Sequence, residues 1–381
     1  QRDERQGLNT AGFVTGYRGS PLGAVDFQMR RASKELVASK IQFKEALNED
    51  LATTALWGAQ QAELRGEGLY DGVFGLWYGK GPGVDRSGDA MRHANMAGSS
   101  VNGGVLMAMG DDHSGESSTV LHQSDLAMID AGMPILSPAG VQEILDYGYY
   151  GFALSRYSGL WVGLKTMKDT IEVTSVVDGD PFRMEFKNPE TMSTSDNLNI
   201  RLVDTPADQE KRLLSDKKTA AEDFARINRI DKVGLPKLNS KIGLVAAGKN
   251  WLDLIHALSL LGIDESEAKA LGITSYKIVQ TWPIDRQSLL EWADQLDLII
   301  VIEEKRKIIE TQIKDALFSI ASKTRVYGGH KNDEYLFFDH GVLDPLDIAS
   351  ALGQIFKEGG CSNDTLELGL KKIIKVQSAD N

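Results

Sequence analysis

The chain has 381 residues, of which 42% are hydrophobic and 25% are charged. These proportions are typical of a globular protein and exclude a fully disordered chain or a fibrous repeat, and the length predicts about two to three domains. The formal net charge of −12 excludes a broadly basic surface for nucleic acid. The single cysteine, Cys361, excludes a disulfide framework, a four-cysteine zinc site and a cysteine-ligated iron–sulfur cluster within these residues.

The longest apolar runs, such as 298–302, are far shorter than the ~20 residues of a membrane span. The N-terminus also lacks a basic region followed by an apolar stretch, which a secretory signal requires. We therefore expect a cytoplasmic protein with no membrane partner. Because the first residue is Gln1 and not methionine, we expect the chain to be part of a longer protein.

Short apolar runs alternate with helical patterns over the first 170 residues. We expect strands at 11–15, 41–45, 73–78, 105–109, 134–136 and 160–164, and helices at 22–37, 51–64, 90–97, 121–129 and 141–154. Strands that alternate with helices in this way predict a parallel sheet covered on both faces. We assign residues 1–187 to this first α/β domain.

The rest of the chain predicts three further segments. Residues 188–239 are polar, with a charged helix at 208–229, and are expected to connect two domains. Residues 240–325 predict a second, smaller α/β domain, with strands at 242–246, 275–280 and 298–302 and helices at 251–261, 286–296 and 308–320. Residues 326–381 carry one clear helix, at 346–356, and are expected to form a tail that leads toward a missing domain.

The segment 243–249 reads GLVAAGK and fits the first seven positions of a phosphate-binding loop. The eighth position is Asn250, so the hydroxyl that would bind magnesium is missing. The apolar interior positions favour a buried strand, followed by a tight glycine turn into a helix.

Two glycine-containing loops follow predicted strands, where ligands bind in open α/β sheets. The first, TGYRGSPLG at 15–23, is explained structurally if Ser20 caps a helix that has Pro21 at its first position, or functionally if Arg18 and Ser20 bind an anion. The second, GKGPG at 79–83, fixes an unusual backbone path and is equally consistent with a plain turn and with a loop beside a ligand.

Acidic side chains occur after two other strands. Asp111, Asp112 and His113 follow the strand at 105–109; without a histidine pair at helical spacing, they favour a hydrogen-bonded polar loop over a metal site. Glu49 precedes the helix at 51–64, where an acid complements the helix dipole without any further role.

Several of these segments together resemble one family. FVTGYRGSPLG (13–23), NEDLATTALWGAQQ (48–61), DGVFGLWYGKGPGVDRSGDAMRHAN (71–95), GDDHSGESSTVLHQS (110–124) and PILSPAGVQEILD (134–146) resemble the N-terminal portion of indolepyruvate ferredoxin oxidoreductase in its bacterial single-chain form. This family consists of thiamine-diphosphate-dependent 2-oxoacid:ferredoxin oxidoreductases. KIGLVAAGKNWLDLIHAL (241–258) and VIEEKRKIIETQIKDAL (301–317) resemble its second domain with weaker specificity.

The resemblance implies a pyrimidine-type thiamine diphosphate-binding domain, followed by a transketolase C-terminal-like α/β domain. It also implies that Glu49 is the glutamate that hydrogen-bonds N1′ of the cofactor's aminopyrimidine. A carboxyl group held partly dry, with a raised pKa, can share a proton with N1′. The exocyclic nitrogen of the ring can then take the proton from C2 of the thiazolium.

The resemblance implies further site residues around Glu49. The loop with Thr15, Tyr17, Arg18 and Ser20 would face the substrate, and Arg18 would pair with the 2-oxoacid carboxylate. A second set would line the cofactor cleft: Lys80, Gly81, Asp85, Arg86, Asp112 and His113.

The family's magnesium- and diphosphate-binding G-D-G motif and its cluster cysteines are absent from the sequence. We therefore expect magnesium and 4Fe-4S clusters only in a missing portion, and an isolated fragment that is inactive. The full-length enzyme would be a homodimer that converts an indolepyruvate-type 2-oxoacid to acyl-CoA with coenzyme A and ferredoxin. The alternative is a non-catalytic pyrimidine-type domain that serves subunit assembly.

Overall fold

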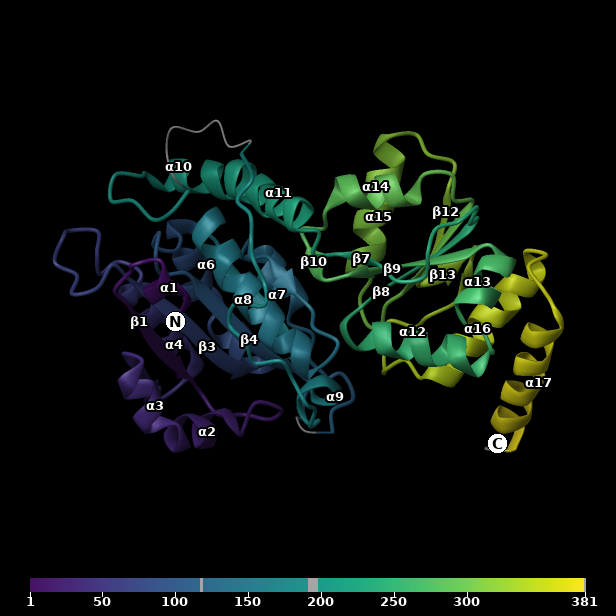
Figure 1. The fold of residues 1–381 in the computed structure, drawn as a ribbon, viewed down its shortest axis with the longest axis horizontal. Helices are drawn as coiled ribbons and strands as arrows, with labels where there is room; N and C mark the ends of the chain where they lie inside the picture. The colour runs from purple at the N-terminus through teal and green to yellow at the C-terminus, as the bar shows by residue number, and fades with distance from the viewer. Residues whose placement is uncertain (117–118, 191–197, 380–381) are drawn as a thin grey trace. The chain divides into compact units, whose positions relative to one another are not determined.

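The structure is a computed structural model that describes residues 1–116, 119–190 and 198–379. It divides into two compact units, residues 1–228 and 229–381, and each has an α/β fold (Figure 1). This division differs from the expected boundaries, because residues 188–228 belong to the first unit and residues 326–381 belong to the second.

Parallel strands form the sheet of the first unit, in the order β5-β6-β4-β3-β1-β2. Their bounds are β1 Thr10–Gly16, β2 Ile41–Glu45, β3 Gly72–Lys80, β4 Val105–Asp111, β5 Ile135–Leu136 and β6 Trp161–Met167. The helices are α1 Arg2–Arg5, α2 Val25–Arg31, α3 Ser33–Ala38, α4 Glu49–Ala59, α5 Gly81–Arg86, α6 Gly88–Ala97, α7 Asp125–Asp130, α8 Val141–Ser158, α9 Lys168–Ile171, α10 Pro206–Lys211, the π-helical turn η1 Arg212–Lys217 and α11 Lys218–Asn228. The parallel sheet expected from the sequence is confirmed.

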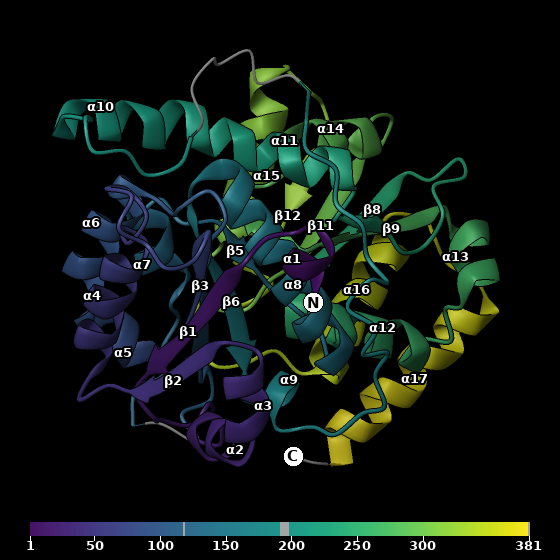
Figure 2. The same cartoon turned by 60° about the vertical axis from the view of Figure 1, so that its left-hand side comes forward.

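Helices cover both faces of this sheet (Figure 2). Gly75 and Val105 are register partners on β3 and β4, and a Cβ at position 75 would lie 2.7 Å from Cδ2 of Leu56 on α4. Leu106, the next residue along β4, points to the opposite face, where a Cβ at Gly151 of α8 would lie 2.6 Å from its Cδ1. Two glycines therefore let α4 and α8 approach the sheet closely from either side.

The predicted capping of a helix by Ser20 is wrong. Helix α2 begins only at Val25, with Ala24 at its N-cap. The segment before it forms a turn in which the backbone N–H of Leu22 donates to the carbonyl of Gly19 at 2.8 Å. Leu22 is buried, with 2% of its surface exposed, and this anchors the turn against the sheet.

Most of the polar segment expected to connect the domains belongs to the first unit, whereas residues 229–239 belong to the second. Residues 191–197 lie outside the described residues. Although the polar segment is rich in charged residues, α11 has one apolar face, which includes Ala220, Ala221 and Phe224. The Phe224 ring lies 5.3 Å from the rings of both Tyr150 and Tyr157 on α8. This apolar face explains why residues with an overall polar composition still join the first core.

Lys217, at the end of η1, is fully buried. Its ammonium donates to the carbonyl of Gly159 at 3.4 Å, and burial, followed by the charge of Arg212, lowers its pKa to about 7 from 10.5. The unfolded chain therefore binds more protons than the folded chain between these two pH values, so stability rises with pH across that window.

Replacing Lys217 by methionine is expected to stabilise the chain by about 1–4 kcal/mol at pH 6, because a buried charge is replaced by an apolar group of similar length. The difference from wild type should shrink as the pH rises from 7 toward 10. Urea unfolding at several pH values measures both effects, and the exposed Lys211 replaced by methionine is the control. A destabilised, pH-independent Lys217→Met variant would contradict the burial of this charge.

The sheet of the second unit has the order β12-β11-β8-β9-β7, parallel except for β7, which runs antiparallel to β9. Its strands are β7 Lys232–Val233, β8 Ile242–Ala247, β9 Ile273–Ile278, β11 Leu298–Ile302 and β12 Arg325–Tyr327. The unit also contains β10 Gln280–Trp282 and the antiparallel pair β13 His330–Lys331 and β14 Glu334–Tyr335. Its helices are α12 Gly248–Leu260, α13 Glu265–Leu271, α14 Arg286–Ala293, α15 Ile308–Ser319, α16 Pro345–Glu358 and α17 Asp364–Ala379.

Alternate residues of the second sheet face two separate cores. Leu244 and Ile300 belong to one core, whereas their neighbours Val245 and Val301 belong to the other, which α14 and α15 cover. The first core is completed by Ile348, Leu352 and Phe356 of α16 and by Leu370 of α17. The expected tail thus contributes helices to one of the two cores of this unit. The packing of this segment was not evident from the sequence, because each of its helices has only one apolar face.

Candidate functional site

The carboxyl ends of β1, β3, β4 and β6 meet at one edge of the first sheet, since these strands are parallel. The segments that follow them carry most of the residues that the sequence singled out. Ligands of open α/β sheets bind at this edge, so its side chains define the candidate site.

Glu49 is the first residue of α4. Asn48 caps the helix, because its Oδ1 accepts from the backbone N–H of Leu51 at 2.8 Å. Only 6% of Glu49 is exposed. Two side chains donate to its backbone carbonyl, Trp77 through Nε1 at 3.1 Å and Thr53 through Oγ1 at 3.0 Å. The backbone is therefore fixed while the carboxylate stays available to another group.

The GKGPG sequence, which is consistent with a plain turn or with a loop beside a ligand, forms the end of β3 and the first turn of α5. A Cβ at Gly83 would lie 2.5 Å from Cγ and 2.6 Å from Oε1 of Glu49. A Cβ at Gly81 would lie 2.3 Å from Nδ1 of His122. Glycine fits these positions because the side chains of Glu49 and His122 occupy the space that a larger side chain would fill.

Asp111, at the end of β4, lies at the centre of a buried polar cluster. It accepts from the backbone N–H of Ser124 at 2.9 Å and from the Ser124 hydroxyl at 2.5 Å. His122 Nδ1 lies 3.6 Å away and Lys165 Nζ 3.8 Å away, and Lys165 also pairs with Asp125 at 2.5 Å. Burial would raise the pKa of Asp111, but the contacts with His122 and Lys165 hold that pKa below its usual range.

Asp112 and His113 are both buried, with 3% of their surface exposed. Asp112 Oδ1 accepts from the Ser114 hydroxyl at 3.1 Å and from the backbone N–H of Gly115 at 2.9 Å. This is the local turn that an aspartate typically forms. His113 Nε2 lies 4.0 Å from Asp111. Both residues therefore lie in a hydrogen-bonded polar loop.

The loop after β1 lies against the end of β3. A Cβ at Gly19 would lie 3.0 Å from Cδ of Lys80. Thr15 is buried at 2% exposure and Tyr17 is 40% exposed; Arg18 is exposed and Ser20 is partly buried. The edge of the sheet therefore brings this loop beside Lys80, and leaves the guanidinium of Arg18 open to solvent.

Asp85 and Arg86 are both exposed on α5. Asp85 is held in place by His122, whose Nε2 lies 2.8 Å from its Oδ2.

Sequence reasoning placed Asp111 in the polar loop after β4 but did not select His122 or Lys165 as site residues. Lys165 lies in a strand that is otherwise apolar, and its partner Asp125 is 40 residues away, so no spacing pattern links them. The available signal was the lysine itself, since a charge inside a buried strand requires a partner.

In the second unit, GLVAAGK forms strand β8 and the start of α12, as predicted. Gly248 makes the turn with a φ of +50°. Lys249 donates to Asp253 at 2.7 Å and to the carbonyl of Leu343 at 3.1 Å. These contacts within the fold explain the lysine without a phosphate.

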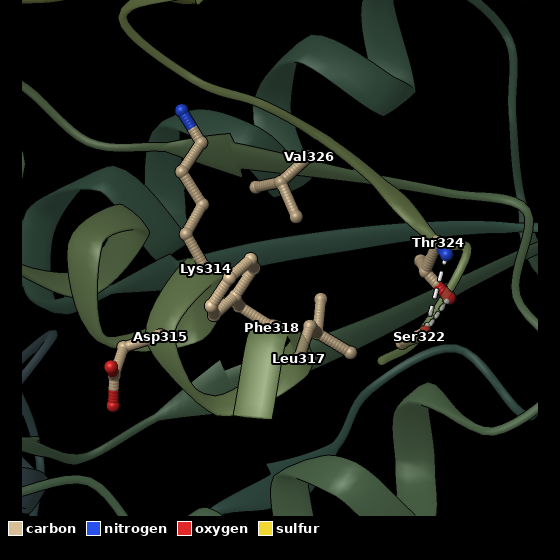
Figure 3. A pocket seen from close by; sticks show the side chains of 7 residues that line it. All are labelled: Lys314, Asp315, Leu317, Phe318, Ser322, Thr324 and Val326. Carbon is tan, nitrogen blue, oxygen red and sulfur yellow. Dashed lines mark hydrogen bonds between the residues drawn. The ribbon is translucent and has the colours of Figure 1, made fainter. Parts of the chain in front are cut away.

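A hollow of about 460 Å³ lies on the second unit, between the end of α15 and β12. Figure 3 shows its lining, Lys314, Asp315, Leu317, Phe318, Ser322, Thr324 and Val326. The Lys314 ammonium is bound by Glu310 at 2.6 Å. The described lining lacks the converging polar groups of a catalytic site and contains none of the predicted site residues.

No helix in the described part of the chain is long and apolar enough to cross a membrane.

The chain is similar in sequence to proteins of one family. Residues 232–380 match the model of the indolepyruvate oxidoreductase domain. The chain is 24% identical to indolepyruvate oxidoreductase subunit IorA of Pyrococcus horikoshii and 23% identical to that of Methanothermobacter marburgensis. These alignments cover 83% of this chain but only 46% and 47% of the relatives. The chain thus spans just under half the length of the curated relatives it matches.

Two solved structures share the fold. The 2-oxoglutarate:ferredoxin oxidoreductase of Magnetococcus marinus, solved with 2-oxoglutarate, coenzyme A and succinyl-CoA, superposes with a TM-score of 0.60 at 14% identity, covering 91% of this chain and 62% of that one. A split gene transketolase superposes with a TM-score of 0.51 at 13% identity, covering 90% and 92%. The expected fold class, two successive α/β units of the kind found in these enzymes, is confirmed.

Proposed function

We propose that the chain is the N-terminal portion of a 2-oxoacid:ferredoxin oxidoreductase that acts on indolepyruvate or a related arylpyruvate. The similarity to IorA subunits supports the reaction class. The single-chain bacterial architecture remains part of the proposal, because the relatives compared are archaeal proteins named as subunits. The observation that carries the proposal is the buried Glu49 carboxylate, held against the glycine turn at the ligand-binding edge of the sheet.

The residues present fit one half of a thiamine diphosphate site. Glu49 offers a carboxyl group whose backbone is fixed by Trp77 and Thr53, and Gly83 leaves room beside it. When bound, the cofactor would supply the carbanion chemistry that cleaves a 2-oxoacid. Glu49 would hold the proton shared with N1′ of the aminopyrimidine, and its restricted exposure would keep water from competing for that proton.

The exposed Arg18 is the residue we propose for the substrate carboxylate, since a planar guanidinium binds a carboxylate through two parallel hydrogen bonds. Thr15, Tyr17 and Ser20 would shape the same loop. Lys80 lies beside this loop and would bring a positive charge toward the acidic substrate or cofactor.

We propose that the remaining cofactor-site residues hold neighbouring side chains and loops in place. Gly81 and Asp85 contact His122, and Asp112 holds its own loop. Together with Arg86 and His113, they would shape the wall of the cofactor cleft. Magnesium, the 4Fe-4S clusters, ferredoxin, coenzyme A and a homodimeric partner would engage the rest of the full-length enzyme.

The decisive experiment is a substrate panel on the full-length protein, purified without oxygen. Indolepyruvate, phenylpyruvate, pyruvate and 2-oxoglutarate would each be supplied with coenzyme A and thiamine diphosphate, and ferredoxin reduction followed by absorbance. We expect reduction that depends on the 2-oxoacid and is fastest with an arylpyruvate. Failure of every 2-oxoacid would overturn the proposal and favour a non-catalytic assembly role.

A further inference from the structure

His122 links an exposed acid to a buried one. Its Nε2 lies 2.8 Å from Asp85 on α5, and its Nδ1 lies 3.6 Å from Asp111 on β4. The His122 side chain is 11% exposed, that of Asp85 62% and that of Asp111 0%. The imidazole therefore joins the surface of α5 to the interior of the sheet through both of its nitrogens.

The buried end of this bridge is rigid. Asp111 accepts two hydrogen bonds from Ser124 and lies 3.8 Å from the Lys165 ammonium. Lys165 is fixed in turn by Asp125. A carboxylate with this many partners remains charged and immobile, so it provides a fixed anchor for the imidazole.

The other end of the bridge, Asp85, lies on α5, the short helix that contains Gly81 and Gly83. Gly81 packs against the His122 ring and Gly83 packs against the Glu49 side chain. Movement of α5 away from His122 would therefore also remove the wall that confines Glu49.

We propose that His122 is a positioning residue for Glu49: its ring, held between Asp85 and Asp111, clamps α5 against the Glu49 carboxyl. The inference rests on the proposed function, because the clamp matters for catalysis only if Glu49 serves the thiamine site. The clamp itself is a property of the free chain and can be tested there.

The clamp depends on pH through the charged groups around the ring. Among the described residues, Asp85 from α5 and Asp111 from β4 face the ring, and Lys165 from β6 and His113 lie beside Asp111. Burial would lower the pKa of His122, but the carboxylates of Asp111 and Asp85 raise that pKa above its ordinary value of 6.5. The clamp is thus complete below pH 6.5 and is lost as the pH rises through the raised pKa.

The first test uses the free 381-residue chain without substrate. Histidines labelled with 15N are titrated by NMR, and amide hydrogen exchange is measured on α5. We expect His122 to titrate above the ordinary histidine value of 6.5, and Asp85→Asn to lower the pKa of His122. His122→Gln should speed exchange on α5 by about tenfold, the loss of one hydrogen bond between charged groups. The matched control is His93→Gln, which removes an exposed histidine paired with Asp89.

The second test uses the full-length enzyme. Wild-type kcat should fall as the pH rises through the His122 pKa measured by NMR, and His122→Gln should lower kcat and remove that pH dependence. An unprotonated His122 at pH 6.5, or unchanged α5 exchange in His122→Gln, would overturn the clamp. If the clamp is intact but no 2-oxoacid is turned over, the proposed function fails and the clamp stands.

Discussion

Replacing Glu49 by glutamine is expected to lower kcat for 2-oxoacid-dependent ferredoxin reduction by about 10²–10⁴-fold, the usual contribution of a positioned proton-transfer group. Glutamine has the same length and fills the same space beside Gly83, but it cannot share a proton with the cofactor. The hydrogen bonds from Trp77 and Thr53 end on the backbone of residue 49, so the helix start should survive. Steady-state kinetics of the full-length enzyme measures the loss.

The matched control is Asp50→Asn, which removes a negative charge from the same first turn of α4. Its kcat should stay within about twofold of wild type, since the dipole interaction that it loses contributes only about 0.3–1 kcal/mol to stability. Equal losses in Glu49→Gln and Asp50→Asn would show that only the helix terminus matters. Wild-type activity in Glu49→Gln would remove Glu49 from the reaction.

Gly83→Ala tests the same site without changing any charge. The added methyl would lie 2.5 Å from Cγ of Glu49, closer than packed carbon atoms allow, so the flexible glutamate side chain should move. A lower kcat with unimpaired folding would show that the position of the carboxylate, and not only its presence, is required.

Elements whose residues are all buried, or all exposed on one face, could be predicted from the sequence. Strand β11, Leu298–Ile302, is continuously apolar because both of its faces are buried, and the sequence placed it at its observed bounds. The start of α2 was not predictable. Ser20 and Pro21 carry good helix-start signals, yet the burial of Leu22 turns the chain there, and tertiary packing overrides the local preference.

The candidate site was predictable only in part. The resemblance drew attention to Glu49 and to the 79–83 loop, and the structure places Glu49 directly beside Gly83. The partners that Asp111 finds in the fold were missed because they come from separate strands and loops. Lys165 and Asp125 are joined only when β4 and β6 pair, and a single sequence carries no record of that pairing.

Replacing Phe356 by alanine is expected to cost the second unit about 3–5 kcal/mol, the usual range for a large buried aromatic residue. Phe356 lies on α16, is fully buried, and packs in the same core as Leu244 and Ile300 of the sheet. A tail that merely led toward another domain would tolerate this change. Urea unfolding followed by hydrogen exchange of the β8 amides isolates the second unit from the first.

The matched control is Phe318→Ala on α15, which removes the same side chain from a position that is 87% exposed. Surface changes of this kind usually alter stability by less than about 0.5 kcal/mol. A large loss in Phe356→Ala beside an unchanged Phe318→Ala would establish that residues 345–379 complete the second fold. Equally small losses of stability in the two variants would mean that α16 does not pack in this core. Leu244 and Ile300 would then have to be buried against another part of the protein.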